Sequence, residues 1–249
     1  MKNVYDLKEF FEEYQSMRDK EINANNLIEN PIIKSMLPSL KNKKILDLGC
    51  GDGNMTEYFM KKGTKKVVGI DISKNMIEEA KKNNKYDNAE YYVLKMENIS
   101  KIKEKFDIVY SSLAFHYIKD YNKLLKDINH LLKSNGMLVY SQESLLNTAV
   151  IFDASKMDNK IVLNNKTYRL LSDYCNESER NILWNDVPVT KYHRTYCTIV
   201  NTLQHNKFKI VDMKDSYATE EVIKICDKYK NQIDKPYFTF IKARKIGKA

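Results

Sequence analysis

Cysteine is scarce in this chain of 249 residues. Its four cysteines, Cys50, Cys175, Cys197 and Cys226, stand far apart, and no C-x-x-C pair occurs. The spacing therefore suggests neither a zinc site nor a thioredoxin-like redox motif, and we predict no metal site. The composition is equally unlike that of a secreted disulfide scaffold or a collagen-like fibre.

Long apolar runs are also missing. Nowhere do 18 apolar residues follow one another, and residues 1–18 form a charged amphipathic stretch without the apolar core of a signal peptide. We therefore expect a cytoplasmic protein with reduced thiols and no membrane partner. No repeat of 20 to 50 residues and no low-complexity linker divides the chain.

Arginine makes up only five of the 42 basic residues, although the net charge is +9. Surfaces that grip phosphate groups favour arginine over lysine. The joint abundance of lysine and asparagine is what an AT-rich genome would produce whatever the function. The charge is therefore weak support for a nucleic-acid partner, which stays open as the less favoured interpretation.

Apolar residues, at 43% of the chain, are sufficient for one large domain with a substantial core. Their periodicity predicts alternating strands and helices. Strands are predicted at 44–48, 66–70, 90–94, 106–110, 136–141, 208–212 and 237–244, and helices at 5–17, 26–36, 54–61, 74–83, 121–132, 195–204 and 219–226. This order predicts an α/β fold, doubly wound, with a mostly parallel seven-stranded sheet and helices on both faces.

The alternation stops between about Glu143 and Thr190, where a polar stretch suggests short strands and loops. We therefore predict four parts. They are an N-terminal helical cap (1–40), an α/β core (41–142), an insertion or lid that selects a substrate (143–194), and the C-terminal completion of the core (195–249).

The most informative segment spans residues 47–54 and reads DLGCGDGN, between a predicted strand and helix. Ligands of open α/β sheets bind beyond the carboxyl ends of the strands, where this loop lies. Its third glycine falls one residue too early for a dinucleotide fingerprint, and no G-K-[ST] follows as in a P-loop. Asp47 would repel phosphates and suits a ligand that carries an ammonium group.

Asp71 ends the next predicted strand, 18 residues after Gly53. At that position a carboxylate can accept hydrogen bonds from both hydroxyls of a ribose. The alternative is that Asp71 only caps the helix that begins near Lys74.

Four segments together resemble the class I S-adenosylmethionine-dependent methyltransferases. They are residues 45–53, 69–73 with Met76, 106–111 and 132–136. The resemblance covers essentially the whole chain. It implies a Rossmann-like methyltransferase fold, S-adenosyl-L-methionine as cofactor, and transfer of its methyl group by in-line displacement.

The resemblance also implies roles for individual residues. Gly49, Gly51 and Gly53 would approach the methionine part of the cofactor, Asp47 would face its amino group, Asp71 would hold the ribose, and Ile72 and Met76 would pack on the adenine. The chain departs from the family at Lys95, where an acid that meets the adenine amino group is expected. The backbone of Met96 is then the expected adenine contact, with Glu97 as a substitute. Cys50 and Ser111, which lie in the matching segments, complete the predicted cofactor-binding set with Arg18.

The outer parts of the chain are similar to a subgroup of bacterial small-molecule methyltransferases. The matching residues are 14–18, Asn25, Glu29, Pro31 and 191–195. On the first helix, Arg18 with Tyr14 is the candidate for closing over the cofactor, because a guanidinium can pair with the methionine carboxylate. The alternative is an arginine solvated on an amphipathic helix.

Two histidines and Tyr14 are the candidate catalytic residues. His116 follows the fourth predicted strand and could orient or deprotonate an acceptor, or could serve only in packing. His193, after the insertion, could line the substrate pocket or could simply fix that segment in place. Cys50 is not expected to act as a nucleophile, because tight packing beneath the glycine loop explains a small side chain there.

Three functions are compatible with these patterns. The first is a methyltransferase that acts on a small molecule, and it is the one we favour. The second keeps the cofactor but uses RNA, such as tRNA, as acceptor, and the third is a non-catalytic module that binds S-adenosylmethionine. Neither the acceptor atom nor an oligomeric state can be read from the sequence.

Overall fold

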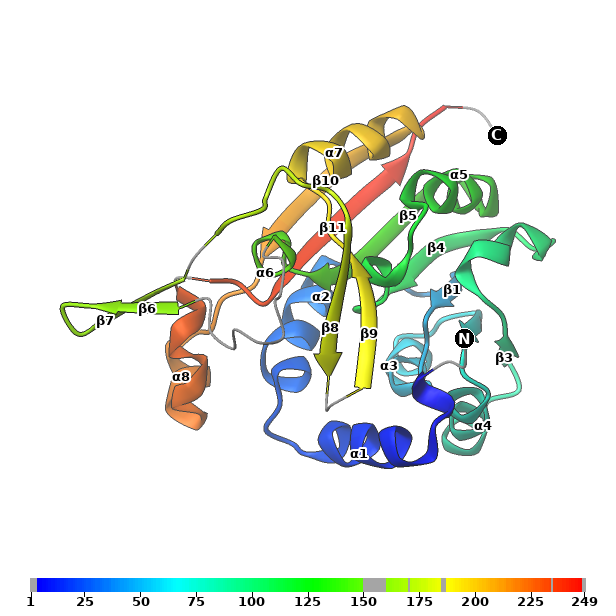
Figure 1. Cartoon of the computed structure of the whole chain (residues 1–249). Coiled ribbons are helices and arrows are strands. Elements are labelled where there is room, and N and C mark those ends of the chain that lie inside the picture. Colours follow the sequence, from blue (N-terminus) through cyan, green and yellow to red (C-terminus); the bar gives the residue numbers. More distant parts are fainter. Residues whose placement is uncertain (1–3, 150–159, 170, 185–186, 234, 248–249) are drawn as a thin grey trace.

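The computed structural model describes residues 4–149, 160–169, 171–184, 187–233 and 235–247. Its main feature is a seven-stranded sheet with the strand order β10-β11-β5-β4-β1-β2-β3 (Figure 1). The strands are β1 (Lys44–Leu48), β2 (Lys66–Asp71), β3 (Ala89–Val93), β4 (Phe106–Ser111), β5 (Leu132–Glu143), β10 (Phe208–Asp215) and β11 (Phe238–Lys245). β1 to β5 pair in parallel, and β11 runs antiparallel to both of its neighbours.

Helices cover both faces of this sheet, because successive strand residues point to opposite sides. Leu46 and Leu48 of β1 pack in one cluster with α5 (Tyr121–Leu131) and α7 (Tyr196–His205). Ile45, which precedes Leu46 and points to the other face, packs in a second cluster with α2 (Asn30–Met36) and α3 (Asn54–Lys61). The near-continuous apolar strands are thus buried on both faces, and the predicted doubly wound α/β fold is confirmed.

The element boundaries follow the predicted pattern closely in the core. β1, α3 and α4 (Lys74–Asn83) begin and end where the sequence predicts them. β5 begins four residues early, at Leu132, because Leu132 already pairs with Phe106 of β4, and the register shifts before the next pair, Ile108 with Met137. The backbone passes through a left-handed residue, Asn135 (φ 59°), in between. The N-terminal part differs more: a 3₁₀ turn, η1 (Val4–Asp6), precedes α1 (Lys8–Asp19), and a π-helical turn, η2 (Asn25–Glu29), precedes α2.

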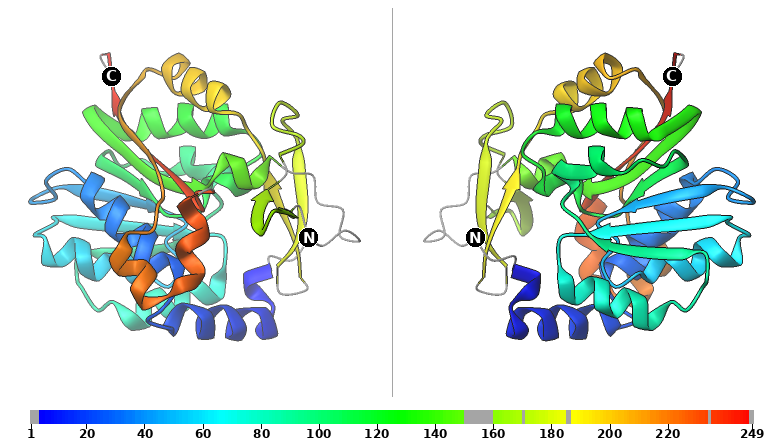
Figure 2. Two further views of the ribbon diagram at one scale, coloured as in Figure 1. Left: turned by 90° about the vertical axis from the view of Figure 1, so that its left-hand side faces the viewer. Right: turned by 90° about the vertical axis from the view of Figure 1, so that its right-hand side faces the viewer.

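The insertion contains a short helix, α6 (Leu145–Thr148), and two antiparallel hairpins. One is formed by β6 (Lys160–Leu163) and β7 (Lys166–Arg169), and the other by β8 (Glu179–Trp184) and β9 (Val187–Tyr192). The β6–β7 hairpin projects from the body of the molecule (Figure 1). The β8–β9 hairpin stands at the side of the sheet where α1 also begins (Figure 2).

The remaining described elements are four short helical segments. They are η3 (Met96–Lys101), η4 (Phe115–Tyr117), α8 (Glu220–Ile225) and η5 (Asp227–Ile233). η4 directly follows the carboxyl end of β4 and lies against β9. Within the described residues, none of the helices has the length and apolar character needed to cross a membrane.

Candidate functional site

The glycine loop after β1 has a backbone that only glycine adopts without strain. Gly49, Gly51 and Gly53 have φ values of 73°, 54° and 75°. A Cβ on Gly53 would lie 2.6 Å from the Asn84 side-chain nitrogen, whereas a Cβ on Gly51 would meet nothing within 4 Å. Gly53 is therefore a packing position, and the open side of Gly51 leaves room for a ligand to approach the backbone.

Asp71 holds this loop against the end of β2. One carboxylate oxygen accepts a hydrogen bond from the Gly51 N–H at 3.0 Å, and the other accepts one from the Ser73 N–H at 2.8 Å. The N-cap of α4 is Ser73, whose hydroxyl accepts from the Met76 N–H, so Asp71 is not the capping residue. Burial raises the pKa of Asp71, and the N–H donors oppose that rise.

Asp47 is the most perturbed acid of the site. Its side chain is only 2% exposed, and among the residues that the structure describes none donates a hydrogen bond to its carboxyl group. Burial, followed by the negative charges of Asp71, Glu29 and Asp52, raises its pKa to about 8. No positively charged group among the described residues pairs with this carboxyl group, so the ammonium group of a ligand would fit there.

The residues predicted around the adenine differ in how accessible they are. Ile72 is 43% exposed directly beside Asp71, while Met76 is buried. The Met96 methyl carbon lies over the loop, 2.9 Å from the place that a Cβ of Gly49 would occupy. Lys95 and Glu97 are both exposed. An apolar surface is thus available from Ile72 and Met96, whereas Met76 lies in the interior.

Ser111 and Cys50 have internal partners. The Ser111 hydroxyl donates a hydrogen bond to the Leu48 carbonyl at 2.7 Å and so ties the end of β4 to the end of β1. Burial and the neighbouring acids raise the pKa of the Cys50 thiol well above its ordinary value. A thiol that stays protonated is a poor nucleophile, in agreement with the packing role expected for Cys50.

His116 is buried in η4, at the base of the β8–β9 hairpin. Its Nδ1 accepts a hydrogen bond from the Glu143 N–H at 3.2 Å, so the neutral ring carries its proton on Nε2. Burial, together with the positive charges of Lys191 and Arg194, holds the pKa of His116 well below its usual range. The ring is therefore a hydrogen-bond donor at neutral pH.

His193 uses both of its ring nitrogens inside the protein. Nδ1 is paired with the Thr148 hydroxyl and Nε2 with the Tyr174 carbonyl, each at 2.8 Å. The carbonyl can only accept, so Nε2 carries the proton and Nδ1 accepts from the hydroxyl. Neighbouring Arg194 donates to the carbonyls of Ile118 and Lys119. These contacts favour the second of the two expectations for His193, a residue that fixes the insertion in place.

Tyr14 and Arg18 lie on α1, but their side chains fall outside the described part of the structure. The start of the chain is nevertheless anchored near the site. Asp6 of η1 accepts a hydrogen bond from the Ser73 hydroxyl at 2.7 Å, at the N-terminus of α4. The cap thus begins beside the residue that follows Ile72.

Three polar residues far apart in the sequence meet in the folded chain. Glu29, 1% exposed, accepts hydrogen bonds from the hydroxyls of Ser112 and Ser141 at 2.9 and 2.6 Å. The sequence marks Glu29 only as part of the subgroup pattern. Its partners lie 83 and 112 residues further along the chain, so no local signal could have joined them.

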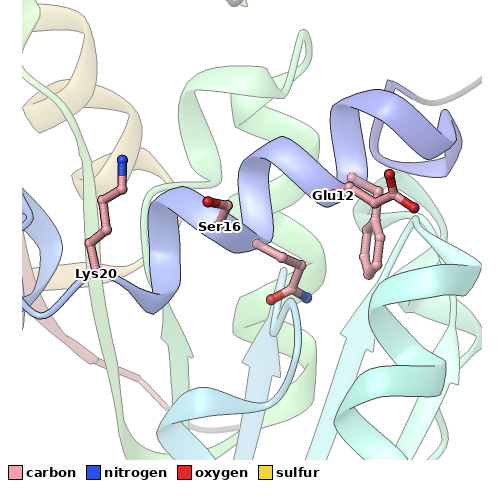
Figure 3. Close-up of a pocket in the computed structure, with 5 residues that line it drawn as sticks. Glu12, Ser16 and Lys20 are labelled. Carbon is pink, nitrogen blue, oxygen red and sulfur yellow. The ribbon is translucent and has the colours of Figure 1, made fainter.

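An open depression of about 530 Å³ lies on the surface of α1. Its described lining residues are Phe11, Glu12, Gln15, Ser16 and Lys20, and Figure 3 shows Glu12, Ser16 and Lys20 in succession along this segment. This lining includes none of the residues at the carboxyl ends of the strands, so the depression is separate from the site built by Asp47, Asp71 and the glycine loop.

Comparisons with known proteins show the family of the chain. The family model for a methyltransferase domain matches residues 46–140. An uncharacterized protein of Haemophilus influenzae is 37% identical over 252 residues, which cover 99% of this chain and 98% of that protein. An S-adenosylmethionine-dependent methyltransferase from Mesorhizobium loti superimposes with a TM-score of 0.82 at 26% identity, covering 90% of this chain and 98% of that chain.

Two further matches bear on the family. A candidate S-adenosylmethionine-dependent methyltransferase from Listeria monocytogenes is 31% identical, with a TM-score of 0.76 and coverage of 88% of this chain and 97% of that one. A ubiquinone biosynthesis O-methyltransferase from Pelagibacter ubique is 39% identical over 116 residues, or 45% of this chain and only 47% of that protein. The chain belongs to the class I S-adenosylmethionine-dependent methyltransferases, and S-adenosyl-L-methionine is its cofactor.

Proposed function

We propose that this enzyme transfers the methyl group of S-adenosylmethionine to a small-molecule acceptor, and that the glycine loop and Asp47 hold the amino-acid end of the cofactor. The observation that carries the proposal is the buried carboxyl group of Asp47. It receives no hydrogen bond from the described residues and lies next to a loop whose Gly51 is open on one side. A cationic group placed there would form a charge-assisted hydrogen bond and offset the cost of burying the carboxylate.

The other cofactor contacts follow from the same edge of the sheet. Both oxygens of Asp71 have lone pairs left after accepting one backbone N–H each, and these would receive the ribose hydroxyls. Ile72 and Met96 provide apolar surface for the adenine. Lys95 offers no acid to its amino group, so we assign that contact to the backbone of Met96.

Bound S-adenosylmethionine supplies a methyl group on its sulfonium sulfur, and the rest of the cofactor leaves with a neutral thioether. The protein therefore has mainly to align the acceptor and exclude water. His116 could align the acceptor, because its ring can donate a hydrogen bond. Its Nδ1 is occupied by the Glu143 N–H, and Nε2–H would hold an acceptor oxygen in line with the methyl group. We therefore assign His116 an orienting role, and His193 a structural one.

We propose that the acceptor is a small molecule and that residues 143–194 act as the lid that selects it. The base of this region is fixed by an ion pair between Lys191 and Glu143 at 2.6 Å and by the His193 contacts. The match to an O-methyltransferase of ubiquinone biosynthesis favours oxygen as the accepting atom.

The test has two measurements. S-adenosylhomocysteine should raise the melting temperature at micromolar concentration, whereas ATP and NADH should not. S-adenosylmethionine labelled in its methyl group should then be incubated with the protein and either a metabolite extract or bulk tRNA. Label in the small-molecule fraction supports the proposal, label in tRNA would make RNA the acceptor, and cofactor binding without turnover in either would favour a non-catalytic module.

A further inference from the structure

Glu29 connects the N-terminal cap to the catalytic edge of the sheet. It ends the π-helical turn η2, is 1% exposed, and uses the single oxygen Oε1 to accept from both Ser112 and Ser141. Ser112 directly follows β4, and Ser141 lies in β5. A carboxylate that accepts two hydroxyl donors inside the protein makes hydrogen bonds stronger than those between neutral groups.

The segment that this contact holds is strained. Leu113, immediately after Ser112, has φ +53°, a left-handed conformation that residues with a Cβ seldom adopt. Its N–H donates to both the carbonyl and the hydroxyl oxygen of Ser141, at 3.1 Å each. Ser141 is thus fixed by Glu29 on one side and fixes Leu113 on the other.

The same segment shapes both halves of the site. The Cβ of Ala114 lies 2.8 Å from the place that a Cβ on Gly49 would occupy, so the glycine loop is seated directly against it. His116 follows two residues later. If Leu113 relaxed toward a right-handed conformation, the chain direction through Ala114 and His116 would change with it.

We propose that Glu29 is a positioning residue of the methyl-transfer site. Through Ser112 and Ser141 it holds Leu113 in its left-handed turn and thereby sets the place of Ala114 against the glycine loop and of His116 beside the acceptor. Because Glu29 belongs to the cap, the site takes its correct geometry only when the cap is packed on the sheet. This inference rests on the proposed function for the meaning of His116, but its contacts are independent of the acceptor.

Hydrogen exchange measured by mass spectrometry on the full chain tests the proposal without a known acceptor. Glu29→Ala removes the shared acceptor oxygen, and we expect peptides covering residues 111–117 to exchange about 5- to 30-fold faster, the factor that corresponds to one residue with a Cβ in a left-handed conformation. Glu29→Gln retains an oxygen at that position and should exchange nearly as the wild type does.

A second change separates positioning from general destabilisation. Leu113→Gly allows the left-handed turn without strain, so in the Glu29→Ala background it should restore most of the protection, measured against Leu113→Gly alone. Asn135→Gly is the matched control, because Asn135 has a similar φ of 59° in β5 but no contact with this cluster. It should restore nothing.

The outcomes are distinct. Three results would each overturn the role of Glu29. They are unchanged exchange in Glu29→Ala, equal acceleration of exchange throughout the sheet, and failure of Leu113→Gly to restore protection. If Glu29→Ala does not fold, the double variant Ser112→Ala/Ser141→Ala removes the same donors and should behave alike. The wild type with S-adenosylhomocysteine tests the proposed function separately: absence of protection at residues 47–54 would refute cofactor binding there, whatever the Glu29 variants do.

Discussion

If Asp47 holds the ammonium group of the cofactor, the affinity for the cofactor should depend on pH. With a pKa of about 8, its carboxyl group is mostly protonated in the ligand-free protein at neutral pH. An ammonium group pairs with the ionised form, so ligand binding must expel the proton. We therefore predict that S-adenosylhomocysteine, which has the same amino-acid end as the cofactor, binds more tightly as the pH rises toward 8.

The size of the effect follows from the pKa. Each pH unit below the pKa costs about 1.4 kcal/mol to ionise the group, or tenfold in affinity. Between pH 6.0 and 7.5 the ionised fraction rises from about 1% to about 24%, so the affinity should rise about 20-fold. This range lies below about 7.7–8.0, where an α-amino group loses its own proton, so most of the ligand is cationic throughout the range.

Isothermal titration calorimetry at several pH values measures both the affinity and the linked proton. At pH 6.5, titrations in buffers of different ionisation enthalpy should show about one proton released per ligand bound. Asp52→Asn is the matched control: it removes one charge that raises the Asp47 pKa, so it should retain proton release and move the pH dependence to lower pH. A constant affinity with no proton release would refute the role given to Asp47.

The same pKa determines how the stability of the ligand-free protein depends on pH. The folded-state pKa of about 8 exceeds the ordinary 3.8, so the folded chain holds a proton that the unfolded chain loses between these values. Stability should therefore fall as the pH rises through this window, by at most about 6 kcal/mol. Asp47→Asn should melt higher than the wild type, by a margin larger at pH 8.5 than at pH 6, and should lose S-adenosylhomocysteine binding.

Three further predictions concern single residues. Gly51→Ala, strained at φ 54°, should weaken S-adenosylhomocysteine binding about 5- to 30-fold by calorimetry, whereas Gly63→Ala, with φ 77° in a distant turn, should leave it unchanged. His116→Ala should lower the methyl-transfer rate with little change in S-adenosylhomocysteine affinity, and the wild-type rate should show no ionisation near pH 6.5, because the pKa of His116 lies well below that value; an inflection there that disappears in the variant would make His116 a base. Cys50→Ala should retain cofactor-dependent methyl transfer in the radiolabel assay, and complete loss of transfer in a variant that melts normally would restore a chemical role to the thiol.

The cofactor half of the proposed site can be drawn from the sequence because it is built locally. Asp47, the three glycines and Asp71 lie within 25 residues of one strand–loop–helix–strand unit. The parallel order of β1 and β2 places their carboxyl ends at one edge, and the positive φ of the loop requires glycine. The periodicity of the strands determined the buried faces in the same way, as Ile45 and Leu46 illustrate.

Distant contacts decided the rest. Which histidine can donate to a ligand depends on partners far along the chain: Glu143 for His116, and Thr148 and Tyr174 for His193. A ring nitrogen has the same chemistry in any sequence, and only its partner in the folded chain selects the tautomer. The link from Glu29 to Ser141 likewise exists only after the cap has packed on the sheet. The sequence by itself thus determined the fold class and the cofactor, whereas the tertiary structure decided the charge of Asp47, the role open to each histidine, and the strain at Leu113.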